Sequence, residues 1–135
     1  METHTSMLVH YIIVRRDLPL GTMAAMITHA AGESAARYRG NSDSTFYTGD
    51  DDTTFMGSVA VVLGVDSVAQ LLKTSHKLNA ANIPYVGVEE SSPPYDGAYM
   101  ALGLVPIERD KVSNLLKDLQ TLKTLILPDD VDDGA

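Results

Sequence analysis

The chain has 135 residues, of which 44% are hydrophobic and 21% are charged, and it contains no cysteine. This length suits one ordinary globular domain, and the lack of cysteine excludes disulfides, thiolate metal sites and cysteine nucleophiles. No apolar run approaches the roughly 20 residues of a membrane span, and the N-terminus lacks the pattern of a signal peptide. We therefore expect a soluble, cytoplasmic protein that forms a single domain over residues 1–135, with its folded core at about 7–127.

The net charge of −8 is concentrated in two acidic segments. Three of the eighteen acidic residues lie at 50–52 and four lie between 129 and 133; without these seven, eleven acids face ten bases, a net charge of −1. We expect the tail at 128–135 to be disordered. Because the remaining body is nearly neutral, the overall charge neither supports nor excludes a partner the size of tRNA.

The stretch HYIIVRRDLPLGTMAAMITHAA predicts a strand, a tight loop and a helix. Residues 8–15 are β-branched and aromatic, as in a buried strand, and Pro19 and Gly21 indicate a turn. Thr22 is the expected helix N-cap, and the helix should run to about Tyr38. This arrangement places functional groups at the carboxyl end of a strand.

Helical spacing places Thr22, Met26, His29 and Glu33 along one narrow stripe of this helix. A polar line on an otherwise apolar helix suggests a functional role for His29. The alternative is a surface stripe in which Glu33 pairs with His29 at a separation of four residues. The sequence leaves both interpretations open.

The middle of the chain predicts a long loop, a second strand and a second helix. Residues 39–56 are polar and acidic, whereas residues 58–65 are almost continuously apolar, as in a strand buried on both faces. Asp66 or Ser67 is the expected N-cap of the next helix, and Gln70 lies at the capping-box spacing from Ser67. This helix should end before the next proline.

The last third predicts two more strands, a helix and a short edge strand. The two strands lie at 85–88 and 98–105, joined by a loop that contains Pro-Pro and Asp-Gly pairs. Leucine spacing predicts an amphipathic helix from about Val112 to Leu122, and residues 125–127 can add an edge strand. The predicted fold class is α/β, with a single mixed four-stranded sheet and helices on its faces, in the order β-α-β-α-β-β-α.

Motifs of several enzyme classes are absent from the sequence. It has no Walker A loop, no GxGxxG opening a helix, no GxSxG elbow and no HExxH, and its four histidines lack metal-ligand spacing. We therefore expect no metal and no cofactor.

The ends of the first and third strands can instead converge at one edge of the sheet. His29, Glu90 and Asp96 are the candidate catalytic groups, because a carboxylate or an imidazole can take a proton from water. A carboxylate in this loop can equally be only solvated, and Ser91 and Ser92 can either donate hydrogen bonds or form the turn.

Four arginines are the candidate anion-binding groups near this cleft. Arg15 can hold a phosphate or a carboxylate, or it can form a structural ion pair with Asp17. Arg16, Arg37 and Arg39 are the other cations expected there.

The residues at the start of the chain resemble a known family. IIVRRDLPLGTMAAMITHA resembles the first strand, loop and helix of the type 2 peptidyl-tRNA hydrolases. VAVVLGVDSVAQLLKTSHKLNAANIPYVGVEE resembles that family's second strand, helix and third strand, and ALGLVPIERDKVSNLLKDLQTLK its last strand, turn and final helix. The resemblance covers almost all of 8–127, is strongest to the branch called peptidyl-tRNA hydrolase domain-containing proteins, and implies the family's fold.

The family's motif can be carried over residue by residue. The positions that match it are Arg15, Asp17, Leu18, Ala24, Ala25, His29 and Ala30, while Glu90, and less well Glu89, takes the place of the family's loop aspartate. The family's lysine falls on Thr22, its glutamine on Met26, and the threonine that opens its last strand on about Met100.

The resemblance implies an enzyme that cleaves the ester bond between a peptide, or an N-blocked amino acid, and tRNA. Its catalytic groups would be His29, Glu90 and Asp96, and its substrate-binding groups Arg15, Asp17 and Thr22. Since Thr22 replaces the lysine, tRNA binding should be weak and steeply salt-dependent, and a small ester is the other substrate considered. The alternative is a non-enzymatic binding or regulatory protein that keeps the fold without the family's catalytic lysine. Because some members of the family form dimers, we also expect a homodimer.

Overall fold

The structure is a computed structural model that describes residues 8–39 and 59–123. Several predictions fall outside these residues, namely the long acidic loop after residue 39, the edge strand at 125–127 and the tail at 128–135. In chain order, the described elements are β1 (Leu8–Arg15), α1 (Leu20–Arg37), β2 (Val59–Val65), α3 (Val68–Ala80), β3 (Tyr85–Glu90), β4 (Ala98–Leu104), β5 (Ile107–Glu108), α4 (Arg109–Leu116) and β6 (Gln120–Thr121).

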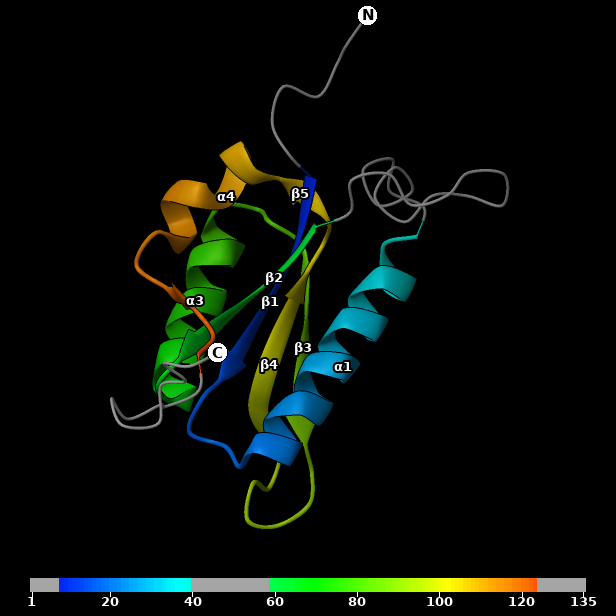
Figure 1. The fold of residues 1–135 in the computed structure, drawn as a ribbon, viewed down its shortest axis with the longest axis vertical. Coiled ribbons are helices and arrows are strands. Elements are labelled where there is room, and N and C mark those ends of the chain that lie inside the picture. Colours follow the sequence, from blue (N-terminus) through cyan, green and yellow to red (C-terminus); the bar gives the residue numbers. More distant parts are fainter. Residues whose placement is uncertain (1–7, 40–58, 124–135) are drawn as a thin grey trace, which may run out of the picture.

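These elements form one mixed sheet with helices on both faces (Figure 1), which confirms the predicted α/β class. The strand order is β3-β4-β1-β2-β6, and β5 pairs with the start of β1. The predicted number of strands was wrong, because the sheet has six and not four. The two extra strands have only two residues each, too short for an apolar pattern to reveal them.

Strand direction decides which loops meet. β1 runs parallel to β2, whereas β4 is antiparallel to both β1 and β3. β3 therefore runs parallel to β1, and the carboxyl ends of β1, β2 and β3 lie at the same edge of the sheet. Figure 1 shows this edge at the bottom, where the β3–β4 loop lies beside the first turn of α1.

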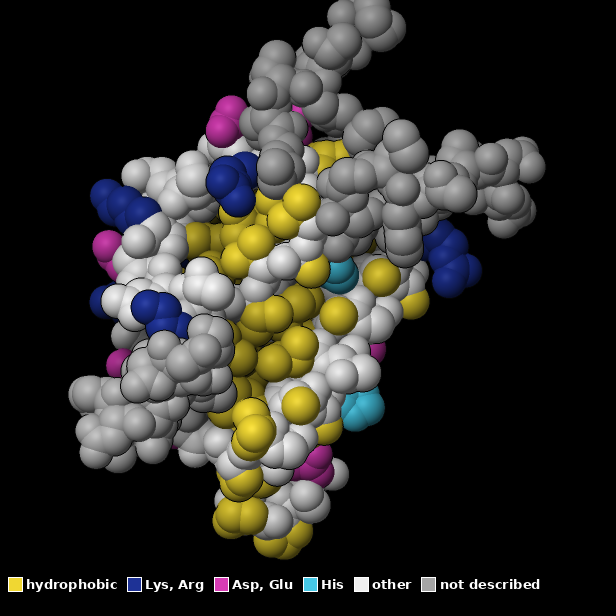
Figure 2. Space-filling view, in the orientation of Figure 1, with side chains coloured by type: hydrophobic (Ala, Val, Ile, Leu, Met, Phe, Trp, Pro, Cys, Tyr) yellow, Lys and Arg dark blue, Asp and Glu magenta, His cyan; other side chains and the backbone are white. Residues whose placement is uncertain are grey.

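Alternation along the strands divides the core into two layers. Val9, Tyr11 and Ile13 of β1 pack on the side of α3 and α4, whereas Ile12 and Val14 pack on the side of α1. Figure 2 shows hydrophobic side chains gathered between α1 and the opposite helices. This double burial explains why β1 lacks an alternating polar pattern.

Two helix boundaries differ from the prediction. α1 begins at Leu20, so Thr22 is not its N-cap; Pro19 occupies the N-cap, and its carbonyl accepts a hydrogen bond from the Met23 N–H at 2.8 Å. α4 ends at Leu116 and does not reach Leu122, because the following residues turn back to the sheet, where the Leu122 N–H donates to the Val62 carbonyl.

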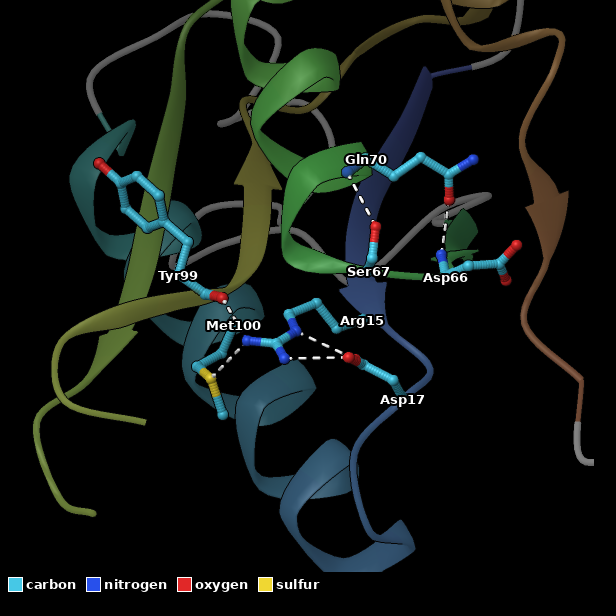
Figure 3. A network of polar contacts seen from close by, with 7 residues as sticks. All are labelled: Arg15, Asp17, Asp66, Ser67, Gln70, Tyr99 and Met100. Atoms are coloured by element: carbon cyan, nitrogen blue, oxygen red, sulfur yellow. Dashed lines mark hydrogen bonds and ion pairs between the residues drawn. The ribbon is translucent and has the colours of Figure 1, made fainter. Parts of the chain in front are cut away.

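The predicted capping box of α3 is present. The Ser67 hydroxyl accepts the Gln70 N–H at 3.2 Å, and the Gln70 amide oxygen accepts the Asp66 N–H at 2.6 Å (Figure 3). Ser67 is thus the N-cap, and these two bonds fix the point where the chain leaves β2.

Among the helices that the structure describes, none is long and apolar enough to cross a membrane.

Candidate active site

The loop between β1 and α1 is fixed by Arg15, at the end of β1. Its Nε and Nη2 each donate to a different carboxylate oxygen of Asp17 at 3.0 Å, and Nη1 donates to the Tyr99 carbonyl at 3.2 Å and contacts the Met100 sulfur at 3.7 Å (Figure 3). The Arg15 side chain is 12% exposed, against 39% for that of Asp17.

These bonds occupy four of the five guanidinium hydrogens. The sequence allowed two roles for Arg15, and the structure contains the ion pair with Asp17. Because Arg15 also reaches main chain and side chain of β4, it ties the β1–α1 loop to the neighbouring strand. Any anion that Arg15 binds must use its remaining Nη2 hydrogen or displace Asp17.

A β-bulge in β4 brings Met100 to Arg15. Val88 pairs with Ala101, but the next residue, Glu89, pairs with Tyr99, so Met100 is an extra residue on β4. The bulge directs Met100 into the core on the α1 side, where it is fully buried. An apolar thioether thus occupies the position where the family resemblance implies a threonine.

Glu90 ends β3 and is held by its own loop. One of its carboxylate oxygens accepts the Ser92 hydroxyl at 2.6 Å and the Ser92 N–H at 3.0 Å. These two bonds, and to a smaller extent the charge of His29, lower the pKa of Glu90 below its usual range. Ser92 has both roles considered for it, because it donates to Glu90 and its carbonyl also accepts the Tyr95 N–H at 2.9 Å in the turn.

His29 is an exposed residue of α1, on the helix that covers the α1 side of the sheet. Val88 packs on the α1 side of the sheet, and alternation directs Glu90, two residues later, to the same side. The small electrostatic effect of His29 on the Glu90 pKa agrees with this placement. His29 and Glu90, which are 61 residues apart in the sequence, therefore lie on the same side of the sheet.

The other candidates surround this pair less closely. Asp96 is an exposed residue near the tip of the β3–β4 loop, with a positive φ of 49°, and its N–H donates to the Ser92 carbonyl at 3.3 Å. Thr22 lies half-buried in the first turn of α1. The β3–β4 loop packs against α1 through Tyr95, which lies in the same apolar cluster as Met23 of α1.

The prediction that four arginines lie near the cleft was wrong for Arg37 and Arg39. Arg16 follows Arg15 at the end of β1, where it pairs with Asp66 at 3.0 Å. Arg37 lies at the far end of α1, about 25 Å along the helix axis from its first residue. Arg39 follows Arg37 at that distant end. In Figure 2 the Lys and Arg side chains of the visible face lie away from the lower end, where the β3–β4 loop is.

A buried polar contact sets the distance between α1 and the sheet. The His10 Nε2 of β1 lies 2.7 Å from the Ser34 hydroxyl of α1, and both residues are buried. The Ser34 hydroxyl also donates to the Ala30 carbonyl at 2.7 Å, and a Cβ on Gly103 of β4 would clash with both Ala30 and Ser34. Burial lowers the pKa of His10, while a backbone hydrogen bond with Leu104 raises it.

A cavity of about 660 Å³ lies beside β3, between the last turns of α1 and the segment that follows α3. Its lining includes Arg37 and Tyr38 of α1 and Tyr85 and Gly87 of β3. Burial raises the pKa of Tyr38 above its usual range.

Within residues 8–39 and 59–123, no group of three or more His, Cys, Asp or Glu residues is placed to hold a metal ion.

The comparisons with known proteins identify the family. The model of the family described as peptidyl-tRNA hydrolase PTH2 matches residues 8–122. The chain belongs to the PTH2 family. The resemblance read from the sequence is thereby confirmed.

A solved structure supports the fold of this PTH2 family member. It is a protein of unknown function, Atu0240, from Agrobacterium tumefaciens strain C58, with a TM-score of 0.61 and 14% sequence identity. The match covers 86% of this chain and 98% of the other, and at this identity it shows the fold alone. No curated protein matches the chain.

Sequence reasoning missed two features of this PTH2 family member. The buried His10 lies in an apolar strand, and its contact with Ser34, 24 residues away, could not be read from the sequence. The cavity beside β3 depends on the position of α1 over the strand. Tyr38, Tyr85 and Tyr99 line this cavity and pack on the same apolar cluster, although they lie in separate elements. The presence of these three tyrosines is the one sign of the cavity in the sequence.

Proposed function

We propose that this protein hydrolyses the ester bond that joins a peptide, or an N-blocked amino acid, to tRNA. The observation that carries the proposal is the placement of Glu90, at the edge where β1 and β3 end, on the side of the sheet that is covered by α1, the helix of His29. Membership of the PTH2 family supports the choice of substrate.

Ester hydrolysis needs a positioned water, a base and a donor for the oxyanion. Glu90 is the proposed base, because its carboxylate lies at the edge of the sheet where the substrate ester would bind. The hydrogen bonds from Ser92 that lower its pKa hold the carboxylate in place and ionised, at the cost of some basicity. The resulting hydroxide attacks the ester carbonyl, and the bond to the 3′-ribose oxygen then breaks. That oxygen takes a proton, for which His29 is the proposed donor, and the carboxylic acid releases its own proton to solvent. Transfer of the water proton from Glu90 to His29 restores both groups, so the products are a peptide carboxylate, a free tRNA 3′-hydroxyl and one proton in solution.

The first turn of α1 is the proposed oxyanion site. The Met23 N–H is the first to bond within the helix, and α1 has no side-chain N-cap bond. The amides of Leu20, Gly21 and Thr22 therefore point out of the helix end, where the helix dipole favours negative charge. A Cβ on Gly21 would meet no atom within 4 Å, so this end of the helix is open.

The proposed site has few groups that can bind the tRNA phosphates. Arg15 and Arg16 are paired with Asp17 and Asp66, and Thr22 carries no charge. We therefore propose weak tRNA binding, since few phosphate contacts are available, and its decrease with salt should be shallower than the sequence suggested, because the slope scales with the number of those contacts. The same observation favours a second candidate function, a binding or regulatory protein that retains the fold without the hydrolytic activity.

One assay separates the two functions. Labelled N-acetyl-aminoacyl-tRNA is incubated at low salt with the wild type, with His29→Ala and with the control His76→Ala, which alters an exposed histidine of α3. We expect turnover by the wild type and the control, and a loss of about 10²-fold or more in His29→Ala. Absence of wild-type turnover, with circular dichroism showing a folded protein, would leave only the binding function.

The proposed substrate also suggests where and how the protein works. Because tRNA esters are made and used in the cytoplasm, we propose a cytoplasmic location. We also propose a homodimer, which light scattering at micromolar concentrations tests directly. A constant mass at the monomer value would rule the dimer out.

A further inference from the structure

The free edge of β3 is the feature that the proposed chemistry leaves unused. Among the strands that the structure describes, β3 pairs only with β4 and lies at the end of the sheet. The cavity of about 660 Å³ opens along this edge at Tyr85, Val86 and Gly87. Side chains of the last turns of α1, including Ala36 and Arg37, form its opposite wall.

The hydrogen bonds of β3 show which main-chain groups face this cavity. The Pro84 carbonyl accepts the Val105 N–H at 3.0 Å, and the Glu90 carbonyl accepts the Gly97 N–H at 2.7 Å. Even-numbered residues of β3 therefore direct their main-chain groups to β4, because the direction alternates along an antiparallel strand. The N–H and C=O groups of Tyr85 and Gly87 consequently point outward, into the cavity.

The same strand leads from the cavity to the proposed base. At about 3.3 Å per residue, Glu90 lies about 10 Å from Gly87 along the strand and about 17 Å from Tyr85. β3 thus runs from an open hydrogen-bonding edge to the carboxylate that would activate water.

We infer that the peptide part of the substrate binds as an added strand on the free edge of β3. The inference rests on the proposed function and specifies where that substrate lies. The ester is at the peptide's C-terminus and must reach Glu90, so the peptide runs parallel to β3, with its N-terminal side in the cavity. Recognition by main-chain hydrogen bonds does not depend on the peptide's sequence.

The parallel arrangement sets the register. A peptide residue opposite Val86 donates its N–H to the Tyr85 carbonyl and accepts the Gly87 N–H, and the residue two positions later donates to the Gly87 carbonyl. With the ester-bearing residue opposite Glu90, the residue opposite Val86 is the fifth from the C-terminus. A single N-blocked amino acid reaches Glu90 but does not reach the cavity.

Binding of a free peptide tests the inference without requiring catalysis. Acetyl-penta-alanine is titrated into the ¹⁵N-labelled wild type, and the Gly87 amide resonance is followed by NMR. Two further peptides are compared, one N-methylated at residues 2 and 4 and one at residues 2 and 3. Alternate methylation leaves one edge of an extended peptide intact, whereas adjacent methylation blocks both edges.

We expect the Gly87 resonance to shift with the unmethylated peptide and with the 2,4-methylated peptide, but not with the 2,3-methylated one. Ala36→Trp, which fills the cavity wall, should weaken binding about tenfold, as loss of one or two main-chain hydrogen bonds would. The control Ala69→Trp, at an exposed position of α3, should bind as the wild type does. No shift at Gly87, or equal binding of both methylated peptides, would overturn the inference.

Hydrolysis distinguishes this failure from failure of the proposed function. With tRNA carrying acetylated peptides of one to eight residues, KM should fall about tenfold up to five residues and then stay level. Turnover with a KM independent of peptide length would overturn the added strand and leave the hydrolase intact. Absence of turnover on every substrate would overturn the hydrolase instead.

Discussion

Substitution of Gly103 by alanine tests how the site is held together. The new methyl group would lie against the Ala30 carbonyl and 2.8 Å from the Ser34 hydroxyl, so α1 must move away from β4. Overpacking of this kind costs about 1–3 kcal/mol of folding free energy. Because α1 carries His29, the same movement displaces His29 from Glu90 and should also lower the rate of hydrolysis.

Gly32 provides a matched control within α1. A Cβ there would meet no atom within 4 Å, so Gly32→Ala should raise the free energy of unfolding by about 0.5–1 kcal/mol through helix propensity. Urea denaturation followed by circular dichroism measures both variants. Equal stability of Gly103→Ala and Gly32→Ala would refute the close approach of α1 to the sheet.

Three further predictions concern the polar contacts. Arg15→Lys should lower the free energy of unfolding by about 1–3 kcal/mol in urea denaturation, because lysine cannot bond Asp17 at two points; wild-type stability would contradict this. Burial lowers the pKa of His10 below 6.5, so the folded state binds this proton less readily than the unfolded state, and the stability should fall as the pH drops below that value. The urea midpoint should therefore change more between pH 7 and pH 5 in the wild type than in His10→Asn. Equal changes in the two proteins would contradict this prediction. Ser92→Ala removes a hydrogen bond that lowers the pKa of Glu90, so the acid limb of the pH–rate profile should move to higher pH, and an unmoved limb would exclude Glu90 as the titrating base.

The main elements of the fold could be predicted because each has a strong local signal. β1 and β2 are largely apolar, and Ser67 with Gln70 marks the start of α3. The family resemblance implied the same fold. Boundaries were less secure where tertiary contacts decide them. Leu119 and Leu122 keep a helical spacing beyond α4, yet both pack on the core from outside a helix.

The geometry around the candidate residues was only partly predictable. The expected parallel direction of β1 and β3 is present, so the loops that carry Asp17 and Glu90 lie at the same edge of the sheet. Contacts between residues that are distant in sequence could not be read from local patterns. Met100 lies 85 residues from Arg15 in the sequence and reaches it through the bulge in β4. Arg37 was predicted near the cleft, but the 18 residues of α1 place it at the opposite end of that helix.

The most direct test of the central claim compares the two adjacent glutamates of β3. Alternation directs Glu90 to the side of the sheet that α1 covers, whereas it directs the exposed Glu89 to the other face of the strand. Steady-state release of labelled N-acetyl-amino acid from tRNA is measured for Glu90→Gln and Glu89→Gln. The account predicts a loss in kcat of about 10²- to 10⁴-fold for Glu90→Gln and a change within about twofold for Glu89→Gln. An unchanged kcat in Glu90→Gln, with the wild type active, would contradict it.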